Sequence, residues 1–294
     1  MHAIAHGDGS SSSPCRRDQP ISRDRQARRS GAAPQFFIVF GHQRTGSTLV
    51  ASRLNSHPSI VCHEEVFLRW VDSEPSLRGW LRATGKPQWM RGMPGTRNAF
   101  VRSLLPGSQL AGKTGAIGFK VMYNQMSLWP ALAYLVPRAG RWLEDPVFRS
   151  WLHANRVLVI HTLRRNHLKI LASHQLAAES GRFHSRDAGT PEHRVVLPVP
   201  GLKARLLRIA SAERAARSVV RNLPSIEVYY EDYIGARGAA DDALLCRALG
   251  QPVPATGLAS SLTKVASDDL RETVKNYEQI AAHLSGTRFE RFLT

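Results

Sequence analysis

"FIVFGHQRTGSTL", residues 37–49, is the stretch that decides the fold of this chain. An apolar run, residues 36–40, stops at Gly41, and the polar residues 42–45 lead to Gly46. A continuous apolar run of this kind is typical of a strand that is covered on both faces in a parallel sheet. The pattern therefore predicts a strand, a loop with two glycines and then a helix.

The predicted loop has the properties of an anion site. The first amides of a helix have no partner within the helix, and they carry the positive end of its dipole. Phosphate and sulfate groups bind at such ends. Gly41 and Gly46 allow the backbone to turn and to approach a ligand closely, and the hydroxyls of Ser47 and Thr48 add donors. We therefore expect this loop to hold a phosphate or a sulfate.

The loop differs from that of ATP-hydrolysing enzymes at one position. Their pattern is G-x-x-x-x-G-K-[ST], and Ser47 stands here where that pattern has lysine. Arg44 supplies a cation instead. The apolar segment 157–162, "VLVIHT", does not end in the aspartate that would hold a metal. A P-loop nucleotide kinase or NTPase is therefore disfavoured, and it stays as an alternative.

The composition limits the class of the protein. The 294 residues carry a formal net charge of +17, and 43% of them are hydrophobic, which is enough for the core of one large α/β domain. Such a charge favours anionic partners: nucleic acid, an acidic membrane surface, or small molecules with phosphate or sulfate.

The cysteines, Cys15, Cys62 and Cys246, are few and widely spaced, which indicates a reducing compartment. No apolar stretch has the ~20 residues of a transmembrane helix, so we expect a cytoplasmic protein able to contact the inner membrane surface.

The chain is predicted to consist of a tail and one domain. Residues 1–35 are rich in Ser, Gly, Arg and Pro, and we expect a disordered basic tail because they cannot bury enough apolar surface. Residues 36–294 are expected to form the domain. Further strands are expected within 59–67, 116–126, 156–166 and 225–233, and helices at 47–56, 168–179, 202–223, 241–249 and 267–293. Strands that alternate with helices predict an α/β fold with a central parallel sheet flanked by helices.

The predicted helix at 202–223 separates apolar residues from basic ones. Apolar residues recur at helical spacing along it. Arg214, Arg217 and Arg221 lie on another stripe, and we expect them to face solvent. The residues before this helix, 181–200, have the composition of a long loop, and long loops in compact domains are often functional.

Four motifs, in this order, resemble one enzyme family. "GHQRTGST" matches the Q-R-[ST]-G-S-T loop of bacterial carbohydrate sulfotransferases of the Nod-factor-sulfating and trehalose-sulfating group, which use 3′-phosphoadenylyl sulfate (PAPS). "CHEEVF" (62–67) is similar to their P-x-E-[FY]-F element, without its proline. "GFKVMYNQ" (118–125) resembles their G-x-K-[LV]-M-x-N-Q strand, and "RNHLKILAS" (165–173) resembles their second strand–helix motif. The resemblance implies a P-loop-like sulfotransferase domain.

The resemblance also implies how PAPS is bound. Arg165 and Ser173, eight residues apart, would hold its 3′-phosphate, and an arginine fork suits that group. Arg164 is a near-equivalent neighbour, so either arginine is open as the ligand. The R-K-G loop of animal members has no match here, and "SLTKVASDDLRE" (261–272) is the segment considered for its place. The phosphosulfate would lie on Gln43, Arg44, Thr45, Gly46, Ser47 and Thr48.

Catalytic residues follow from the same resemblance. Sulfuryl transfer requires in-line positioning, charge stabilisation and a base for the acceptor hydroxyl. Glu65 is expected to be the general base, with Glu64 or His63 as alternatives. Arg44 would neutralise the transferring group, and Lys120 would either meet the same charge or extend to solvent. No metal is expected, because no His, Cys or Asp cluster has metal-ligand spacing.

The implied acceptor is a hydroxyl of a carbohydrate or a glycolipid. Trp70, Trp80, Trp89 and Trp129 have flat rings that suit stacking on sugars, although tryptophans at such positions are more often part of the core. His184 and His193, in the long loop, are the other candidates for contact with the acceptor. The sequence leaves a homo-oligomer open.

Two further alternatives complete the hypotheses. A basic nucleic-acid-binding protein would be expected to interleave aromatic with basic residues, and this chain does not. A degenerate sulfotransferase would bind the donor without catalysis. Such a protein would be expected to have lost residues of these motifs, whereas this chain retains Arg44, Glu65, Arg165 and Ser173.

Overall fold

The computed structural model describes residues 34–68, 75–93, 95–110, 115–125, 146–180, 194–262, 267 and 269–294. Residues Pro34–Thr294 form one compact unit. Residues 1–33 are not among the described residues, so the predicted basic tail stays a prediction.

Helices and strands alternate along the described chain. The strands are β1 (Gln35–Gly41), β2 (Ile60–His63), β3 (Ala116–Met122), β4 (Leu158–Leu163) and β5 (Ser225–Tyr229). The α-helices are α1 (Ser47–Asn55), α2 (Leu77–Ala83), α3 (Thr96–Leu110), α5 (Pro146–Ala154), α6 (His167–Ser180), α7 (Leu202–Val220), α8 (Tyr230–Tyr233), α9 (Gly238–Ala248), α10 (Leu270–Thr273) and α11 (Tyr277–Leu284). Short 3-10 helices are η2 (Gln88–Gly92), η3 (Tyr123–Gln125) and η4 (Glu290–Phe292).

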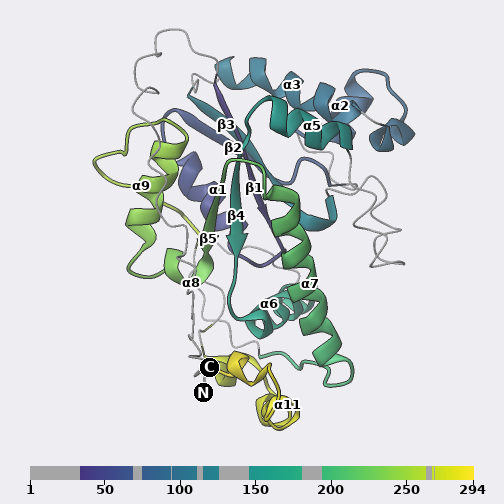
Figure 1. The fold of residues 1–294 in the computed structure, drawn as a ribbon, viewed down its shortest axis with the longest axis vertical. Coiled ribbons are helices and arrows are strands. Elements are labelled where there is room, and N and C mark those ends of the chain that lie inside the picture. Colours follow the sequence, from purple (N-terminus) through teal and green to yellow (C-terminus); the bar gives the residue numbers. More distant parts are fainter. Residues whose placement is uncertain are drawn as a thin grey trace, which may run out of the picture. The chain divides into compact units, whose positions relative to one another are not determined.

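The described strands form one parallel sheet in the order β2-β3-β1-β4-β5 (Figure 1). β1 lies in the middle, where Phe37 pairs with Gly118 of β3 and with Leu158 of β4. This arrangement confirms the predicted α/β fold with a central parallel sheet. Because the strands are parallel, their carboxyl ends share one edge of the sheet.

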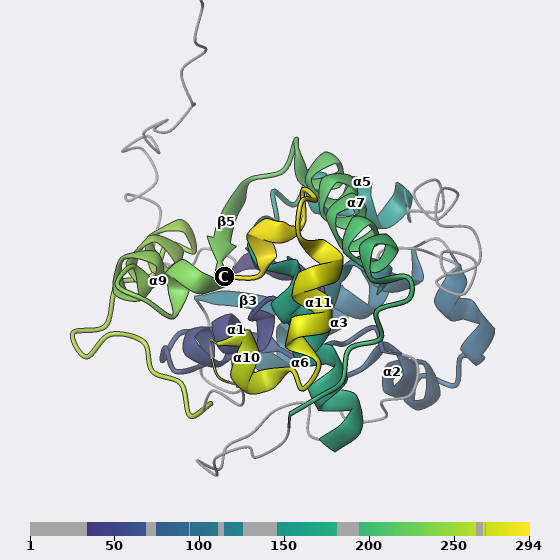
Figure 2. The same cartoon turned by 90° about the horizontal axis from the view of Figure 1, so that it is seen from below.

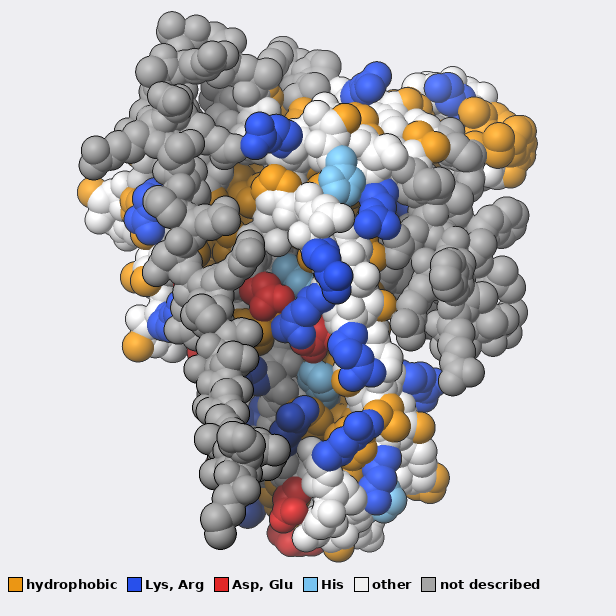
Figure 3. Space-filling view, viewed as in Figure 1, with side chains coloured by type: hydrophobic (Ala, Val, Ile, Leu, Met, Phe, Trp, Pro, Cys, Tyr) orange, Lys and Arg blue, Asp and Glu red, His pale blue; other side chains and the backbone are white. Residues whose placement is uncertain are grey.

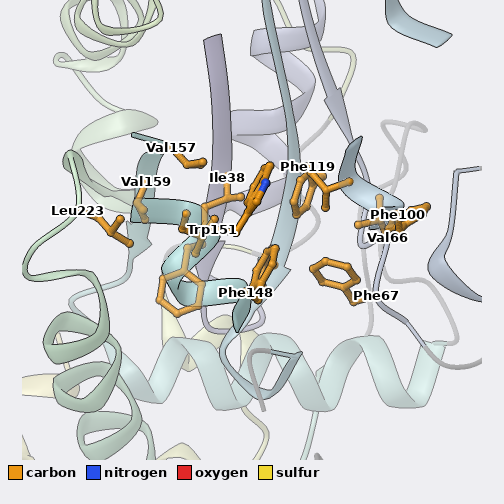
Figure 4. Close-up of a cluster of buried hydrophobic side chains, with 14 of the residues drawn as sticks. Ile38, Val66, Phe67, Phe100, Phe119, Phe148, Trp151, Val157, Val159 and Leu223 are labelled. Carbon is orange, nitrogen blue, oxygen red and sulfur yellow. The ribbon is translucent and has the colours of Figure 1, made fainter. Parts of the chain in front are cut away.

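Both faces of the sheet are covered, as the apolar run of β1 predicts. Ile38 points into a core on one face, together with residues of α2, α3, α5 and α7 (Figure 4). Phe37 and Val39 point to the other face, where α1 and α9 pack. Successive side chains of a strand alternate between faces, so a strand between two helical layers needs an apolar residue at every position.

A third core lies beyond the carboxyl edge of the sheet. It joins α6 and the start of α7 to α10, α11 and η4. Figure 2, which views the molecule from below, shows α6 and α11 lying across this edge. The C-terminal residues therefore help to build the surroundings of the strand ends. Asn166, for example, donates to the carbonyl oxygens of Phe292 and Thr294.

All four of the further predicted strands end earlier than expected: β2 stops at His63, β4 at Leu163, and β3 and β5 as follows. The strand expected at 225–233 stops at Tyr229, and Tyr230–Tyr233 forms the helix α8. The reason is local: the Glu231 carboxylate accepts hydrogen bonds from the backbone amides of Arg165 and Asn166, which fixes a turn after β5. The strand expected at 116–126 stops at Met122, because the Gln125 side chain accepts from the Met122 amide.

The surface carries a band of basic side chains along α7 (Figure 3). Arg208, Arg214 and Arg221 are exposed there. Such a band contributes to the net charge of +17. Among the described residues, no helix combines the length and the apolar character needed to cross a membrane.

We expect Gly118→Ala to destabilise the domain by about 1–3 kcal/mol, because overpacking a well-packed core displaces its neighbours. Gly118 lies beside Phe37 in the sheet, and a Cβ there would overlap the buried Phe37 ring. Urea unfolding followed by circular dichroism measures the change. An unchanged unfolding midpoint would show that the strands are less closely packed than described.

Candidate functional site

The predicted loop lies at the carboxyl edge of the sheet. β1 ends at Gly41 and α1 begins at Ser47, which confirms the predicted strand, loop and helix. Segments from the other strands reach the same edge: residues 64–65 after β2, η3 after β3, residues 164–166 after β4, and α8 after β5. These segments and the loop form the carboxyl-edge site. Ligands of parallel α/β sheets bind at such edges.

The loop has a strained backbone that its surroundings support. Arg44 has a φ of 67°, which residues other than glycine rarely adopt and which is often found at ligand sites. Gly46 has a φ of 88°, and a Cβ there would lie 2.6 Å from Cδ2 of Tyr230. The Thr45 hydroxyl donates to the carbonyl oxygen of His42 at 2.7 Å. The N-cap residue of α1 is Gly46, which has no side chain to cap the helix.

Two arginines converge on the loop. Arg44 Nε donates to Ser173 Oγ of α6 at 2.9 Å. Arg164 Nη1 donates to the carbonyl oxygen of Arg44 at 3.3 Å, and its guanidinium stacks on the Tyr230 ring at 4.6 Å. Burial, with the nearby charge of Arg164, lowers the pKa of Arg44. Two cations held this close create a positive field that favours an anion at the loop.

Arg165 points to a different partner. Its guanidinium forms two hydrogen bonds of 2.7 Å with the Asp232 carboxylate and lies 4.3 Å from the centre of the Tyr229 ring. In the structure Ser173 thus contacts Arg44 of the loop, whereas Arg165 pairs with Asp232 of α8. The predicted joint grip of Arg165 and Ser173 on one phosphate stays a prediction.

Lys120 is buried and belongs to the site. Its side chain is only 1% exposed, and Nζ donates to Thr48 Oγ1 of α1 at 2.9 Å. The same ammonium group pairs with Glu64 and lies 3.9 Å from Glu65 Oε1. Lys120 was expected either to face the charge at the loop or to extend to solvent. In the structure its side chain is buried and faces α1, the helix that follows the loop.

The candidate bases after β2 differ in exposure. The Glu65 side chain is 20% exposed, and its Oε2 accepts from Gln125 Nε2 at 2.9 Å. The Glu64 side chain is 67% exposed. His63 has its pKa lowered by burial, and its Nε2 has no hydrogen-bond partner among the described residues. Glu65 is the carboxylate that combines partial burial with a fixed orientation.

A partly buried polar network beside the loop was not predicted from the sequence. His161 of β4 is fully buried, and its Nε2 is 2.7 Å from the Tyr123 hydroxyl. Its Nδ1 lies 3.9 Å from Glu227 of β5. Arg217 of α7 then bridges Glu227 and Glu213 at 2.7 Å each, and Glu213 lies 3.1 Å from His167 Nε2. We call these residues the α7 network.

The α7 network corrects one expectation about the helix. Arg217, expected to face solvent with Arg214 and Arg221, contacts two carboxylates and donates to the Tyr229 hydroxyl at 2.9 Å. The sequence did offer one signal, because His161 interrupts the apolar run of β4. A polar residue in a strand that is covered on both faces needs a hydrogen-bond partner, and Tyr123 of η3 supplies one to His161 Nε2, while the register of β5 places Glu227 beside His161.

Several residues expected to contact the acceptor lie away from the carboxyl-edge site or are not among the described residues. Trp70, Trp129, His184 and His193 are not among the described residues. Trp80 packs against the core that α2 and α3 share, and Lys86 lies 4.6 Å from the centre of its ring. Trp89 is 69% exposed on η2, so among the described tryptophans it is the one with an open face.

The carboxyl-edge site combines two chemical functions. The arginines and the helix N-terminus can hold an anion, and Glu65 beside Lys120 can accept a proton from a bound hydroxyl. Among the described residues, no group of three or more His, Cys, Asp or Glu could hold a metal ion. The arrangement therefore suits the transfer of an anionic group to a hydroxyl.

One family model covers most of the chain. The model of the Stf0 sulphotransferase family matches residues 36–279. A crystal structure of a sulfotransferase from Alicyclobacillus acidocaldarius is similar over 89% of this chain and 96% of that chain, with 14% identity and a TM-score of 0.42. No curated protein sequence matches.

The α7 network should make stability depend on pH. Burial lowers the pKa of His161 to about 4, from 6.5. Below pH 6.5 the unfolded chain therefore binds a proton that the folded chain does not, so the free energy of unfolding falls as the pH falls from 6.5 to 4. We expect a loss of about 3 kcal/mol from this histidine.

Urea unfolding at a series of pH values measures this dependence. In His161→Gln the amide can still hydrogen-bond Tyr123 but does not titrate, so its stability should fall much less between pH 6.5 and pH 4. If the free energy of unfolding falls equally with pH in wild type and in His161→Gln, groups other than His161 cause the acid sensitivity.

Proposed function

Since this chain belongs to the Stf0 sulphotransferase family and is a sulfotransferase, we propose that it moves a sulfuryl group from PAPS to a hydroxyl of a carbohydrate or glycolipid acceptor. The observation that carries the proposal is the hydrogen bond between Arg44 and Ser173. It joins two motifs that are 129 residues apart and that the resemblance assigns to opposite ends of PAPS.

The proposed donor site is the loop and the corner between β4 and α6. The amides and hydroxyls at residues 45–48, together with Arg44 and Gln43, would receive the phosphosulfate. Arg165 and Ser173 would receive the 3′-phosphate. For this, Arg165 has to exchange its Asp232 partner for the nucleotide, whereas Arg164 already lies beside the loop. Both arginines suit a phosphate, because a guanidinium fork can donate two parallel hydrogen bonds.

The proposed transfer step depends on charge and position. The acceptor oxygen attacks the sulfur in line, the bond from sulfur to the 5′-phosphate oxygen breaks, and the acceptor proton passes to Glu65. Arg44 and Lys120 stabilise the negative charge that grows on the leaving oxygen. Lys120 also orients the base, since its Nζ lies 3.9 Å from Glu65 Oε1.

We expect Glu65→Gln to bind PAPS normally and to lose about 10²–10⁴-fold in kcat, because the amide cannot accept the acceptor proton. Glu64→Gln is the matched control, since Glu64 touches the same lysine and is far more exposed. Radiolabelled PAPS with a panel of sugars and glycolipids gives kcat, and calorimetry gives donor affinity. Normal turnover in Glu65→Gln, or an equal loss in Glu64→Gln, would contradict the assignment of the base.

The ligand of the 3′-phosphate can be identified with two nucleotides, adenosine 3′,5′-bisphosphate and adenosine 5′-phosphate. Arg165→Ala should weaken binding of the bisphosphate by about 10–100-fold and leave the monophosphate unaffected, because only the bisphosphate has the group that Arg165 would hold. Arg164→Ala should weaken both nucleotides to the same extent. Calorimetric titration separates these outcomes, and the opposite pattern would make Arg164 the 3′-phosphate ligand.

A further inference from the structure

Gln125 has a buried side chain beside the proposed base. It is the last residue of η3, the short helix that follows β3, and the residue is only 6% exposed. The transfer step proposed above gives it no part. Its side-chain amide nevertheless makes two hydrogen bonds inside the protein, one to the backbone at the end of β3 and one to the Glu65 carboxylate.

The two partners fix the orientation of the Gln125 amide. Oε1 accepts from the backbone amide of Met122 at 3.0 Å, and Nε2 donates to Glu65 Oε2 at 2.9 Å. A backbone amide can only donate and a carboxylate can only accept, so the reversed orientation would lose both hydrogen bonds. The oxygen of the Gln125 amide is thus anchored to the sheet, and its nitrogen points at Glu65.

The backbone of Glu65 is held independently of Gln125. The amide of Lys120 donates to the carbonyl oxygen of Glu64 at 3.3 Å, which extends the pairing of β2 with β3 by one residue. The carbonyl oxygen of Glu65 accepts from the amide of Leu68 at 3.2 Å, which closes a turn. What these contacts leave free is the rotation of the Glu65 side chain, and the hydrogen bond from Gln125 restrains it.

The two oxygens of the Glu65 carboxylate have different surroundings. Oε2 is occupied by the Gln125 amide. Oε1 lies 3.9 Å from Lys120 Nζ, which is beyond hydrogen-bond distance. The Glu65 side chain is 20% exposed, so part of it is open to a substrate. Oε1 is therefore the oxygen that is available for the proton of an acceptor hydroxyl.

We propose that Gln125 is a positioning residue for the transfer reaction: by holding Oε2 of Glu65, it directs Oε1 toward the acceptor hydroxyl. The proposal rests on the proposed function, in which Glu65 is the general base. Gln125 touches neither donor nor acceptor, so it acts only through Glu65. A general base has to lie within hydrogen-bond reach of the proton and in a defined direction, so a carboxylate that rotates freely is a weaker catalyst.

Two variants separate this role from a structural one. Gln125→Met keeps the length of the side chain and removes the amide. Gln125→Glu keeps an oxygen for the Met122 amide and puts a second carboxylate oxygen against Glu65. If Gln125 served only to close the turn after β3, Gln125→Glu would behave as wild type. Gln175→Met is the matched control, because Gln175 Nε2 also donates to a glutamate, Glu179 Oε1, at 2.8 Å on the exposed side of α6.

We expect Gln125→Met to lower kcat about 10–100-fold with labelled PAPS and the best acceptor of the panel, because a misplaced base slows the transfer. The calorimetric affinity for adenosine 3′,5′-bisphosphate should stay at the wild-type value. A double-mutant cycle identifies the route of the effect. In the Glu65→Gln background, Gln125→Met should cause no further loss, because no base is left to position. Gln175→Met should behave as wild type.

Gln125→Glu adds a dependence on pH that a structural role would not produce. At about pH 9 both carboxylates are ionised and repel each other, so kcat should be about tenfold or more below wild type. At about pH 6 the pair takes up one proton, and a protonated carboxyl group can donate to Glu65 Oε2 as the amide does. The ratio of kcat to that of wild type should therefore rise as the pH falls. Lys120 and Glu64, the charged neighbours of Glu65, are the same in both proteins.

The outcomes that would overturn the proposal differ from failure of the proposed function. If wild type transfers the sulfuryl group and Gln125→Met, folded by circular dichroism, keeps its kcat, the positioning role is wrong and the proposed function stands. An equal loss in the Glu65→Gln background, or a wild-type kcat of Gln125→Glu at every pH, would also overturn it. The second of these decides alone if Gln125→Met does not fold. If wild type transfers nothing from PAPS to any acceptor, the proposed function fails and the positioning role fails with it.

Discussion

The position of β1 between β3 and β4 is the constraint on which the rest of the site depends. Gly41, the last residue of β1, is so close to β4 that a Cβ there would lie 2.9 Å from the Thr162 carbonyl oxygen. The loop therefore leaves the sheet directly beside the start of α6. For this reason Arg44 can reach Ser173, although the two are far apart in sequence. Any strand order that separated β1 from β4 would remove this contact.

The alternation of side chains along β1 and β3 gives the loop two different sides. Lys120 of β3 points to the face that α1 covers, where it meets Thr48 and the carboxylates after β2. Tyr123 and His42 lie on the face that α7 covers, beside the histidines and carboxylates of the α7 network. Lys120 and the carboxylates after β2 thus lie on one side of the loop, and the aromatic and charged residues of the α7 network lie on the other.

The α7 network is buried at one end and open to solvent at the other. His161 is fully buried in the middle of β4, whereas the side chains of Arg217 and Glu227 are each 39% exposed. Perturbed and paired titratable groups of this kind gather at functional sites. The hydrogen bonds of the network hold the His161 and His167 rings in fixed orientations.

The sequence by itself determined the parallel α/β fold, the loop of β1 and the family, because these depend on local patterns: an apolar run, glycine spacing and short motifs. It also identified Lys120 and the carboxylates beside it. It did not determine which partner each arginine takes. Arg165 and Asp232, or His161 and Glu227, come together only when distant strands pair. Neighbours across a sheet are set by strand order and register, and these arise from packing of the whole chain, so only the tertiary structure decided them.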